Sequence, residues 1–229
     1  MKQEPRQTRR SRVGIPVLQV GEDVKGLREQ KKQATRRHIA DVATALFVAK
    51  GFDNVTVAEI AEAAHVSKMT VFNYFPRKED LFLDRHADRV AGLERVIRER
   101  PAGVSVATAL RRHHHDLLQA RHPLSGATEG VRWFWQILRS TPALVSRMHE
   151  QGREIEDAFA AVLADEFGDP RRARLVASLL AAAVGAIFGT AVQRLLDGDD
   201  VEEVRRDQAR IIDEAFDLLE HGIGDYGRR

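Results

Sequence analysis

A capping box at Thr56 and Glu59 restricts the fold of this chain more than any other feature of its sequence. The Thr56 hydroxyl can accept from the amide of Glu59, and the Glu59 carboxylate can reach back to the amide of Thr56. This pairing satisfies amides that are otherwise left without partners at a helix start. A short helix is therefore predicted to begin at Thr56 and to end by Ala64.

A second short helix is predicted directly after the first. Ser67 is a suitable N-cap, and Pro76 stops the helix after about residue 75. Helices joined by so tight a turn cross at a large angle, and each buries one side only. The predicted buried set is Ile60, Ala61, Ala64, Val66, Val71 and Phe75. The predicted outward set is Lys68, Met69, Thr70, Asn73 and Tyr74.

Residues 32–50 precede this pair with apolar side chains at helical spacing, and Gly51 ends that helix. The pair within residues 56–75 then has the form of a helix-turn-helix, whose second helix fits the major groove of DNA. The run GFDNVTVAEIAEAAHVSKMTVFNYFPRKEDL, residues 51–81, closely resembles the DNA-binding domain of the tetracycline repressor (TetR) family. With the preceding helix, the resemblance covers roughly residues 33–85.

The resemblance implies an all-α homodimer, with three N-terminal helices for DNA and a C-terminal helical domain for ligand binding and dimerisation. Thr56 and Lys78 lie near helix starts, which suit a phosphate. Asn73 can pair with adenine and Lys68 can donate to guanine, while Met69 suits a thymine methyl group. The candidate DNA-binding residues are Thr56, Ser67, Lys68, Met69, Thr70, Phe72, Asn73, Tyr74 and Lys78.

Three residues depart from the family pattern. His65 and Met69 stand where the family usually has glycine, and Phe72 stands where it usually has tyrosine. Histidine tolerates a left-handed turn, so the fold survives, but Phe72 lacks the hydroxyl for one expected phosphate contact. Two alternatives stay open: Phe72 belongs to the core, and Tyr74 packs on the fourth helix.

Charge is distributed unevenly along the chain. Residues 1–101 hold 20 Lys and Arg against 14 Asp and Glu, a net +6, and the rest holds 16 against 20, a net −4. The N-terminal half therefore faces a polyanion. Residues 1–30 are predicted to form a basic flexible arm, which either enters the minor groove or acts as a solubilising tail. Its arginines are Arg6, Arg9, Arg10 and Arg12.

The DNA-binding domain is predicted to span residues 31–85, and a helical regulatory and dimerisation domain residues 86–229. A long helix at residues 78–98 links the two. Pro101, Pro123, Pro142 and Pro170 mark later breaks. The further predicted helices are 105–120, 126–139, 143–166, 170–196 and 201–221.

The helix at 170–196 has a stripe of small residues that allows a close approach of another helix. By resemblance, this helix and the one at 201–221 form a four-helix interface with their copies; the alternative is packing within one chain. The candidate interface residues are Ser178, Ala182, Gly185, Gly189, Ile212 and Phe216.

An aromatic cluster is the candidate effector site, because small-molecule pockets combine apolar walls with a few polar groups. Ordinary core packing is the alternative. The candidate residues are His113, Arg132, Trp133, Phe134, Trp135 and Phe188. No metal site is predicted, because the consecutive histidines 113–115 point about 100° apart on a helix. No cofactor is predicted.

Absent features exclude other classes. The chain has no cysteine, which rules out disulfides and thiolate zinc sites, and no HExxH, GxSxG, GxGxxG or P-loop motif. Residues 175–192 carry no formal charge, but a buried interface helix is favoured over a membrane span. The sequence predicts a cytoplasmic repressor that binds a double-stranded operator and responds to a small molecule. An activator of the same fold, a helical enzyme and an architectural or membrane-bound module remain alternatives.

Overall fold

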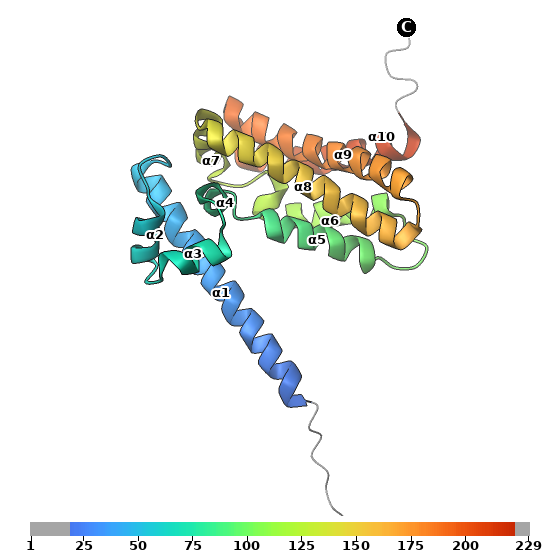
Figure 1. Ribbon diagram of the computed structural model, residues 1–229. Coiled ribbons are helices and arrows are strands. Elements are labelled where there is room, and N and C mark those ends of the chain that lie inside the picture. The colour runs from blue at the N-terminus through green and yellow to red at the C-terminus, as the bar shows by residue number, and fades with distance from the viewer. Residues whose placement is uncertain (1–18, 223–229) are drawn as a thin grey trace, which may run out of the picture.

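The computed structural model describes residues 19–222, with side chains described for residue 28 and residues 30–222. Over this part the chain is helical without strands, which confirms the all-α prediction. Figure 1 shows a head, from which α1 projects as a rod, beside a body of longer packed helices. The elements are α1 (Gln19–Lys50), α2 (Val57–Ala63), α3 (Lys68–Tyr74), α4 (Lys78–Phe82), α5 (His86–Arg98), α6 (Val106–Gln119), the 3-10 turn η1 (Pro123–Ser125), α7 (Val131–Ser140), α8 (Pro142–Phe167), α9 (Pro170–Asp197) and α10 (Val201–His221).

The head forms as the local signals predict. The Thr56 amide donates to Glu59 Oε2 over 2.8 Å and the Glu59 amide donates to Thr56 Oγ1 over 3.2 Å, so the capping box is confirmed. The Ser67 hydroxyl accepts from the amide of Thr70 at 2.9 Å and starts α3. His65 adopts φ 54°, the left-handed turn predicted between α2 and α3. These caps position α3 on a core of apolar side chains from α1 and α2.

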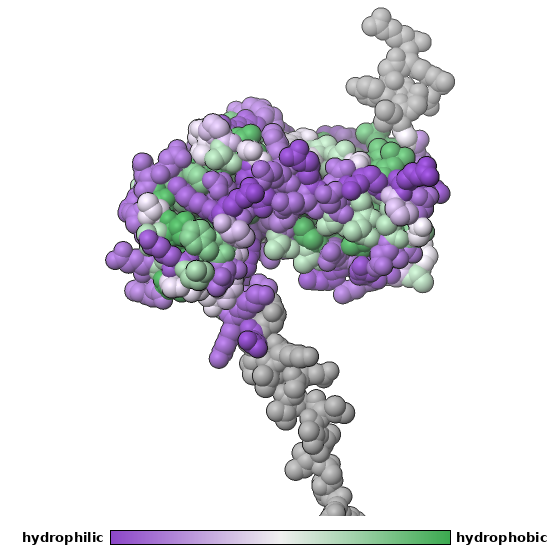
Figure 2. Space-filling view, in the orientation of Figure 1, coloured by the Kyte–Doolittle hydropathy of each residue, from purple (hydrophilic) through white to green (hydrophobic). Residues whose placement is uncertain are grey.

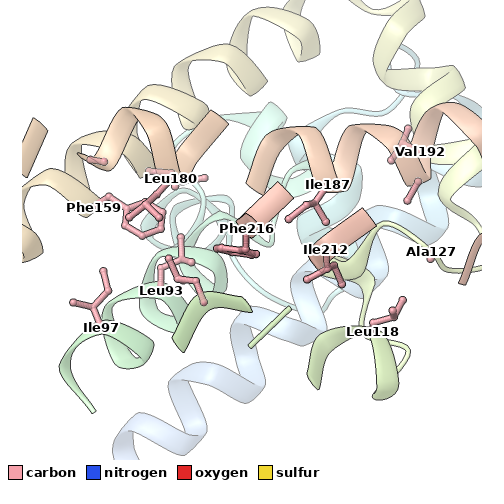
Figure 3. Packing of buried hydrophobic residues seen from close by; sticks show 14 of the residues in the cluster. Leu93, Ile97, Leu118, Ala127, Phe159, Leu180, Ile187, Val192, Ile212 and Phe216 are labelled. Carbon is pink, nitrogen blue, oxygen red and sulfur yellow. The ribbon is translucent and has the colours of Figure 1, made fainter. Parts of the chain in front are cut away.

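The body is a bundle in which α8 runs along α9, while α10 packs on α6 and α9. Its core contains Leu93, Phe159, Leu180, Ile187 and Phe216, which come from four helices and point toward one another (Figure 3). The predicted helices at 105–120, 143–166, 170–196 and 201–221 are confirmed to within a few residues.

The predicted arm and the first helix overlap in the structure. α1 begins at Gln19 instead of near residue 32, so the part of the predicted arm from 19 to 30 is helical. This prediction was wrong because residues 19–30 have no clear apolar stripe, which is the signal that marks a helix in sequence. The arginines at 6, 9, 10 and 12 lie outside the described residues.

The predicted helix at 78–98 is two helices, because the chain breaks after α4 and restarts at α5. The break is stabilised from elsewhere: Arg36 donates to the Asp84 carbonyl over 2.6 Å, and Gln151 donates to the Leu83 carbonyl over 3.4 Å. Carbonyls released from a helix need such partners. Neither partner is close in sequence, so the break could not be predicted.

The predicted helix at 126–139 begins only at Val131. Gly126 has φ 78°, and a Cβ added there would lie 3.1 Å from the Phe188 carbonyl oxygen. Gly130 has φ 83°. Both positions require glycine, since side chains strain this conformation. The segment therefore crosses close over α9 before α7 starts.

Candidate DNA-binding surface and regulatory body

The outer side of α3 presents four predicted DNA-binding residues together: Lys68, Met69, Phe72 and Asn73 are all exposed. Met69 is 69% exposed and Phe72 46%. Figure 2 shows hydrophobic surface over the α2–α3 part of the head, within a largely hydrophilic exterior. The alternative that Phe72 belongs to the core is therefore wrong. This face combines one cation, one amide and two apolar groups, the chemistry that reads base edges.

Three other predicted DNA-binding residues, Ser67, Thr70 and Tyr74, make contacts within the head itself. Ser67 and Thr70 place their hydroxyl oxygens 2.8 Å apart within the cap of α3. Tyr74 is half-buried and packs against the head core. These residues stabilise α3 more than they add to its exposed candidate DNA-binding surface.

Thr56 and Lys78 are both engaged by neighbouring side chains. The Thr56 hydroxyl donates to Glu59 Oε2 over 2.9 Å. Hydrogen bonds from Lys50 and then from Thr56 hold the pKa of Glu59 at about 2, so a carboxylate charge stays beside Thr56. Lys78 Nζ lies 4.3 Å from the centroid of the Phe52 ring. A phosphate would have to compete for both groups.

Aromatic rings join the head to the body. Phe82, at the end of α4, stacks on Phe134 with ring centroids 4.6 Å apart, and its centroid lies 6.0 Å from that of Trp133. Trp133 and Phe134 therefore pack in the head cluster. Both were expected to line an effector pocket, whereas in the structure both rings lie against Phe82 of the head.

An ionic cluster lies beside this aromatic contact. Arg147 on α8 is largely buried and approaches Asp80 at 2.6 Å, Glu154 at 2.7 Å and Glu150 at 3.2 Å. Arg77 pairs with the same Glu150 at 2.6 Å. Because Asp80 and Arg77 belong to the head, the charges fasten α4 to α8.

The remaining predicted effector residues lie in two separate places. Trp135 meets Phe188 with ring centroids 6.1 Å apart, and nearby Arg132 Nε donates to the Leu195 carbonyl over 2.9 Å. His113 lies elsewhere, in the lining of a surface cavity of about 220 Å³ between α5 and α6. Arg95 and Arg112 line the same cavity. The structure thus does not gather the predicted set into one pocket.

The small-residue stripe of α9 is open to solvent in the single chain. Ala182, Gly185 and Gly189 are exposed, and an added Cβ at either glycine would meet nothing within 4 Å. The alternative that these glycines pack within one chain is wrong. Leu175 and Leu179 extend the exposed apolar surface. α9 is long and apolar enough to cross a membrane. This is only weak evidence for a membrane span, because core helices of soluble proteins pass the same test.

Ile212 and Phe216 do not belong to this open surface. They are 1% and 0% exposed and point into the body core (Figure 3). Assigning them to the interface was wrong, because the apolar stripe of α10 is already covered by α6 and α9. On α10, Leu218 is the large apolar side chain that stays exposed, at 51%.

Two family models match the chain. Residues 39–84 match that of bacterial regulatory proteins of the tetR family, and residues 104–224 match that of the MftR C-terminal domain. The second match alone covers more than half of the 229 residues. The chain belongs to the TetR family.

Relatives support the same assignment for this TetR-family chain. The transcriptional regulator TcmR of Streptomyces glaucescens is 28% identical over 171 residues, 71% of this chain and 74% of TcmR. MftR of Mycobacterium tuberculosis, a putative mycofactocin biosynthesis regulator, is 32% identical over 82 residues, 36% of this chain and 41% of MftR.

Among solved structures, the TetR-family repressor FadR of Thermus thermophilus, in complex with lauroyl-CoA, is 26% identical, with a TM-score of 0.50. The match covers 82% of this chain and 94% of FadR. These relatives are regulators of transcription, so this TetR-family chain is a DNA-binding regulator and not an enzyme.

Mild acid should destabilise this TetR-family protein, chiefly through His114. Its ring is buried, with Nδ1 2.8 Å from the Leu110 carbonyl oxygen, and burial lowers its pKa to about 4. An unfolded histidine has a pKa near 6.5, so between these values the unfolded chain binds a proton that the folded chain does not. The free energy of unfolding should therefore fall as pH drops from 7 to 5, by about 2 kcal/mol for this residue.

Urea titrations at pH 7 and pH 5 measure this loss. Burial also lowers the pKa of His86, His113 and His122, so some pH dependence will persist without His114. A His114→Leu variant should lose less stability than the wild type between the two pH values. Equal losses in both proteins would contradict the assignment.

Proposed function

We propose that this regulator is a repressor that binds a palindromic operator as a homodimer and leaves it when a small molecule binds the body. The exposed side of α3 carries the proposal. A two-fold dimer would place two copies of α3 in major grooves separated by a turn of DNA, or a multiple of one, about 34–36 Å per turn. Its place of action is the cytoplasm, where a bacterial operator lies.

The open stripe of α9 supports the dimer. Exposed glycines offer a close approach between helices, and the flanking leucines offer apolar area to bury. A single chain that leaves such a stripe in water is completed by a second copy, since large apolar patches on a soluble surface mark interaction sites.

The contact between head and body supports ligand control. Phe82 and Asp80 hold α4 against α7 and α8, so a ligand that moves either helix also moves the head. The related FadR, solved with lauroyl-CoA, shows that a repressor of this family takes a ligand. The rival reading, an activator, uses the same DNA surface and differs only in its effect on transcription.

Removing base-reading groups from α3 should weaken operator binding. Lys68→Ala and Asn73→Ala should each lower affinity about tenfold to hundredfold, since a well-placed base contact contributes about 1–3 kcal/mol. Fluorescence anisotropy at one fixed salt concentration measures this, on an operator selected from genomic fragments. Arg112→Ala, which removes an exposed cation from the body, is the control and should bind as the wild type does. Wild-type affinity in both α3 variants would refute this reading surface.

A reporter gene placed behind the same operator separates repression from activation. Deleting the regulator should raise expression if it is a repressor. A fall in expression would favour the activator.

A further inference from the structure

Arg89 is a partly buried arginine on α5 that lacks an acidic partner. Among the residues that the structure describes, it makes no hydrogen bond or ion pair, and its guanidinium carbon lies 5.6 Å from the centroid of the Phe188 ring. Other little-exposed arginines have acids beside them: Arg100 has Glu166, and Arg147 has Asp80. A charge taken partly out of water without a partner is costly, and such charges cluster at functional sites.

The surroundings of Arg89 do not offset its charge. Burial lowers the pKa of the guanidinium, and no nearby carboxylate raises it. Its titratable neighbours are His86 and His114, and burial lowers the pKa of each imidazole, which favours the neutral form. One uncompensated positive charge therefore faces the aromatic centre of the body.

A second donor without an acceptor lies beside the same Phe188 ring. Trp135 Nε1, on α7, is buried and has no hydrogen-bond partner in the described structure. The Trp135 and Phe188 ring centroids are 6.1 Å apart. A buried indole N–H normally finds an acceptor. Two donors thus lie beside Phe188, and neither has an acceptor among the described residues.

We propose that Arg89 and Trp135 form the polar end of an effector site between α5, α7 and α9, which binds a small molecule with a carboxylate on an apolar body. A guanidinium pairs with a carboxylate through two parallel hydrogen bonds, and the indole adds a third donor. One cation balances a monoanion, which favours a carboxylate over a phosphate dianion. Phe188 supplies an apolar wall. The inference rests on the proposed ligand control and names its ligand class.

The location of this site explains how ligand binding would affect the DNA-binding head. α5 follows directly after the break at residues 83–85, and α7 carries Trp133 and Phe134 against Phe82. A ligand held between Arg89 and Trp135 would pull on both helices that touch the head. Operator affinity would change with it.

The cavity between α5 and α6 is the rival location for an anion. Arg95, Arg100 and Arg112 line it, but Glu99 and Asp116 line it too and Arg100 is paired with Glu166, so acids offset the positive charge there. Arg89→Gln and Arg95→Gln therefore make a matched pair, since both change an arginine of α5 to the same neutral residue.

Three probes that share one alkyl chain test the ligand class: octanoate, octanol and octylammonium. Calorimetry on the full chain should show octanoate binding about tenfold or more tightly than octanol, because hydrogen bonds to charged groups are the stronger ones. Octylammonium should not bind. Arg89→Gln should reduce octanoate to the level of octanol, and Arg95→Gln should change nothing. Trp135→Phe, which keeps the ring and loses the donor, should weaken octanoate several-fold.

A fluorescence readout places the probe beside Trp135. The chain has two tryptophans, so Trp133→Phe leaves Trp135 as the single reporter. Octanoate should shift its emission, and this shift should vanish when Arg89→Gln is added.

Stability separates a ligand-binding role from a structural one. Arg89→Met removes an unpaired charge, so its Tm without probe should equal or exceed that of the wild type. Any of three results would overturn the site. These are a lower Tm for Arg89→Met, equal affinity of the wild type for octanoate and octanol, and loss of octanoate binding in Arg95→Gln alone. Operator titration without probe tests the proposed function separately. Octanoate bound at Arg89 without operator release would refute ligand control by this anion and leave the binding site standing.

Discussion

Replacing Gly185 with leucine should dissociate the proposed dimer while leaving the fold of each chain intact. Apart from its own helix backbone, no described residue lies within 4 Å of an added Cβ there, so the side chain would point into solvent in the monomer. Replacing a helical glycine even favours the helix by about 0.8–1 kcal/mol. In the dimer, leucine would push apart helices that approach through small residues. Overpacking costs about 1–3 kcal/mol per site and occurs twice in a symmetric dimer, so the dissociation constant should rise on the order of a hundredfold.

Gly152 offers a matched control on α8. It is an exposed helical glycine, and an added Cβ there meets nothing within 4 Å either. Sedimentation velocity at micromolar concentration should find Gly152→Leu dimeric and Gly185→Leu monomeric, both with an unchanged or higher Tm. Operator affinity should fall only with Gly185→Leu. Two separate monomers bind the two half-sites independently and lose the added affinity that a dimer gains by binding both at once. A wild-type protein that sediments as a monomer would refute the dimer outright.

Replacing Phe82 with alanine should lower the free energy of unfolding by about 3–5 kcal/mol, the usual effect of removing a buried phenylalanine. Phe82 is buried at the end of α4 between two sets of rings. Phe47 and Phe52 lie on the head side at 5.9 Å and 5.8 Å between centroids, and Phe134 stacks from the body at 4.6 Å. Alanine would leave a cavity that these large, rigid rings fill poorly.

Urea unfolding followed by circular dichroism measures the change. Phe167→Ala is the control, because Phe167 is exposed at the end of α8 and its loss opens no cavity. Phe82→Ala should also weaken the coupling of head to body. A ligand that releases the operator from the wild type should therefore release it less from Phe82→Ala. If Phe82→Ala destabilises no more than Phe167→Ala, the aromatic contact does not hold the head.

The helix-turn-helix of the head could be predicted almost completely because its signals are local. The capping box at Thr56, the cap at Ser67 and the left-handed turn at His65 each involve residues within a few positions of one another. Periodicity alone then placed the exposed side of α3. Such features depend on the backbone of one segment and need no knowledge of what packs against it.

The body needed the tertiary structure, because side-chain burial depends on which helices become neighbours. Ile212 and Phe216 have the apolar spacing of an interface, yet they face α6 and α9 of their own chain. Trp133 and Trp135 are close in sequence but pack on opposite partners, Phe82 and Phe188.

Sequence patterns thus determined that this chain is a helical DNA-binding regulator and which side of α3 is exposed. Only the packed structure could show that Arg89 and Trp135 lie beside the same Phe188 ring with no acceptor among the described residues. The reason is physical: a cap or a helix face follows from bonds along one segment, whereas a missing partner is defined by everything that distant segments bring to that place.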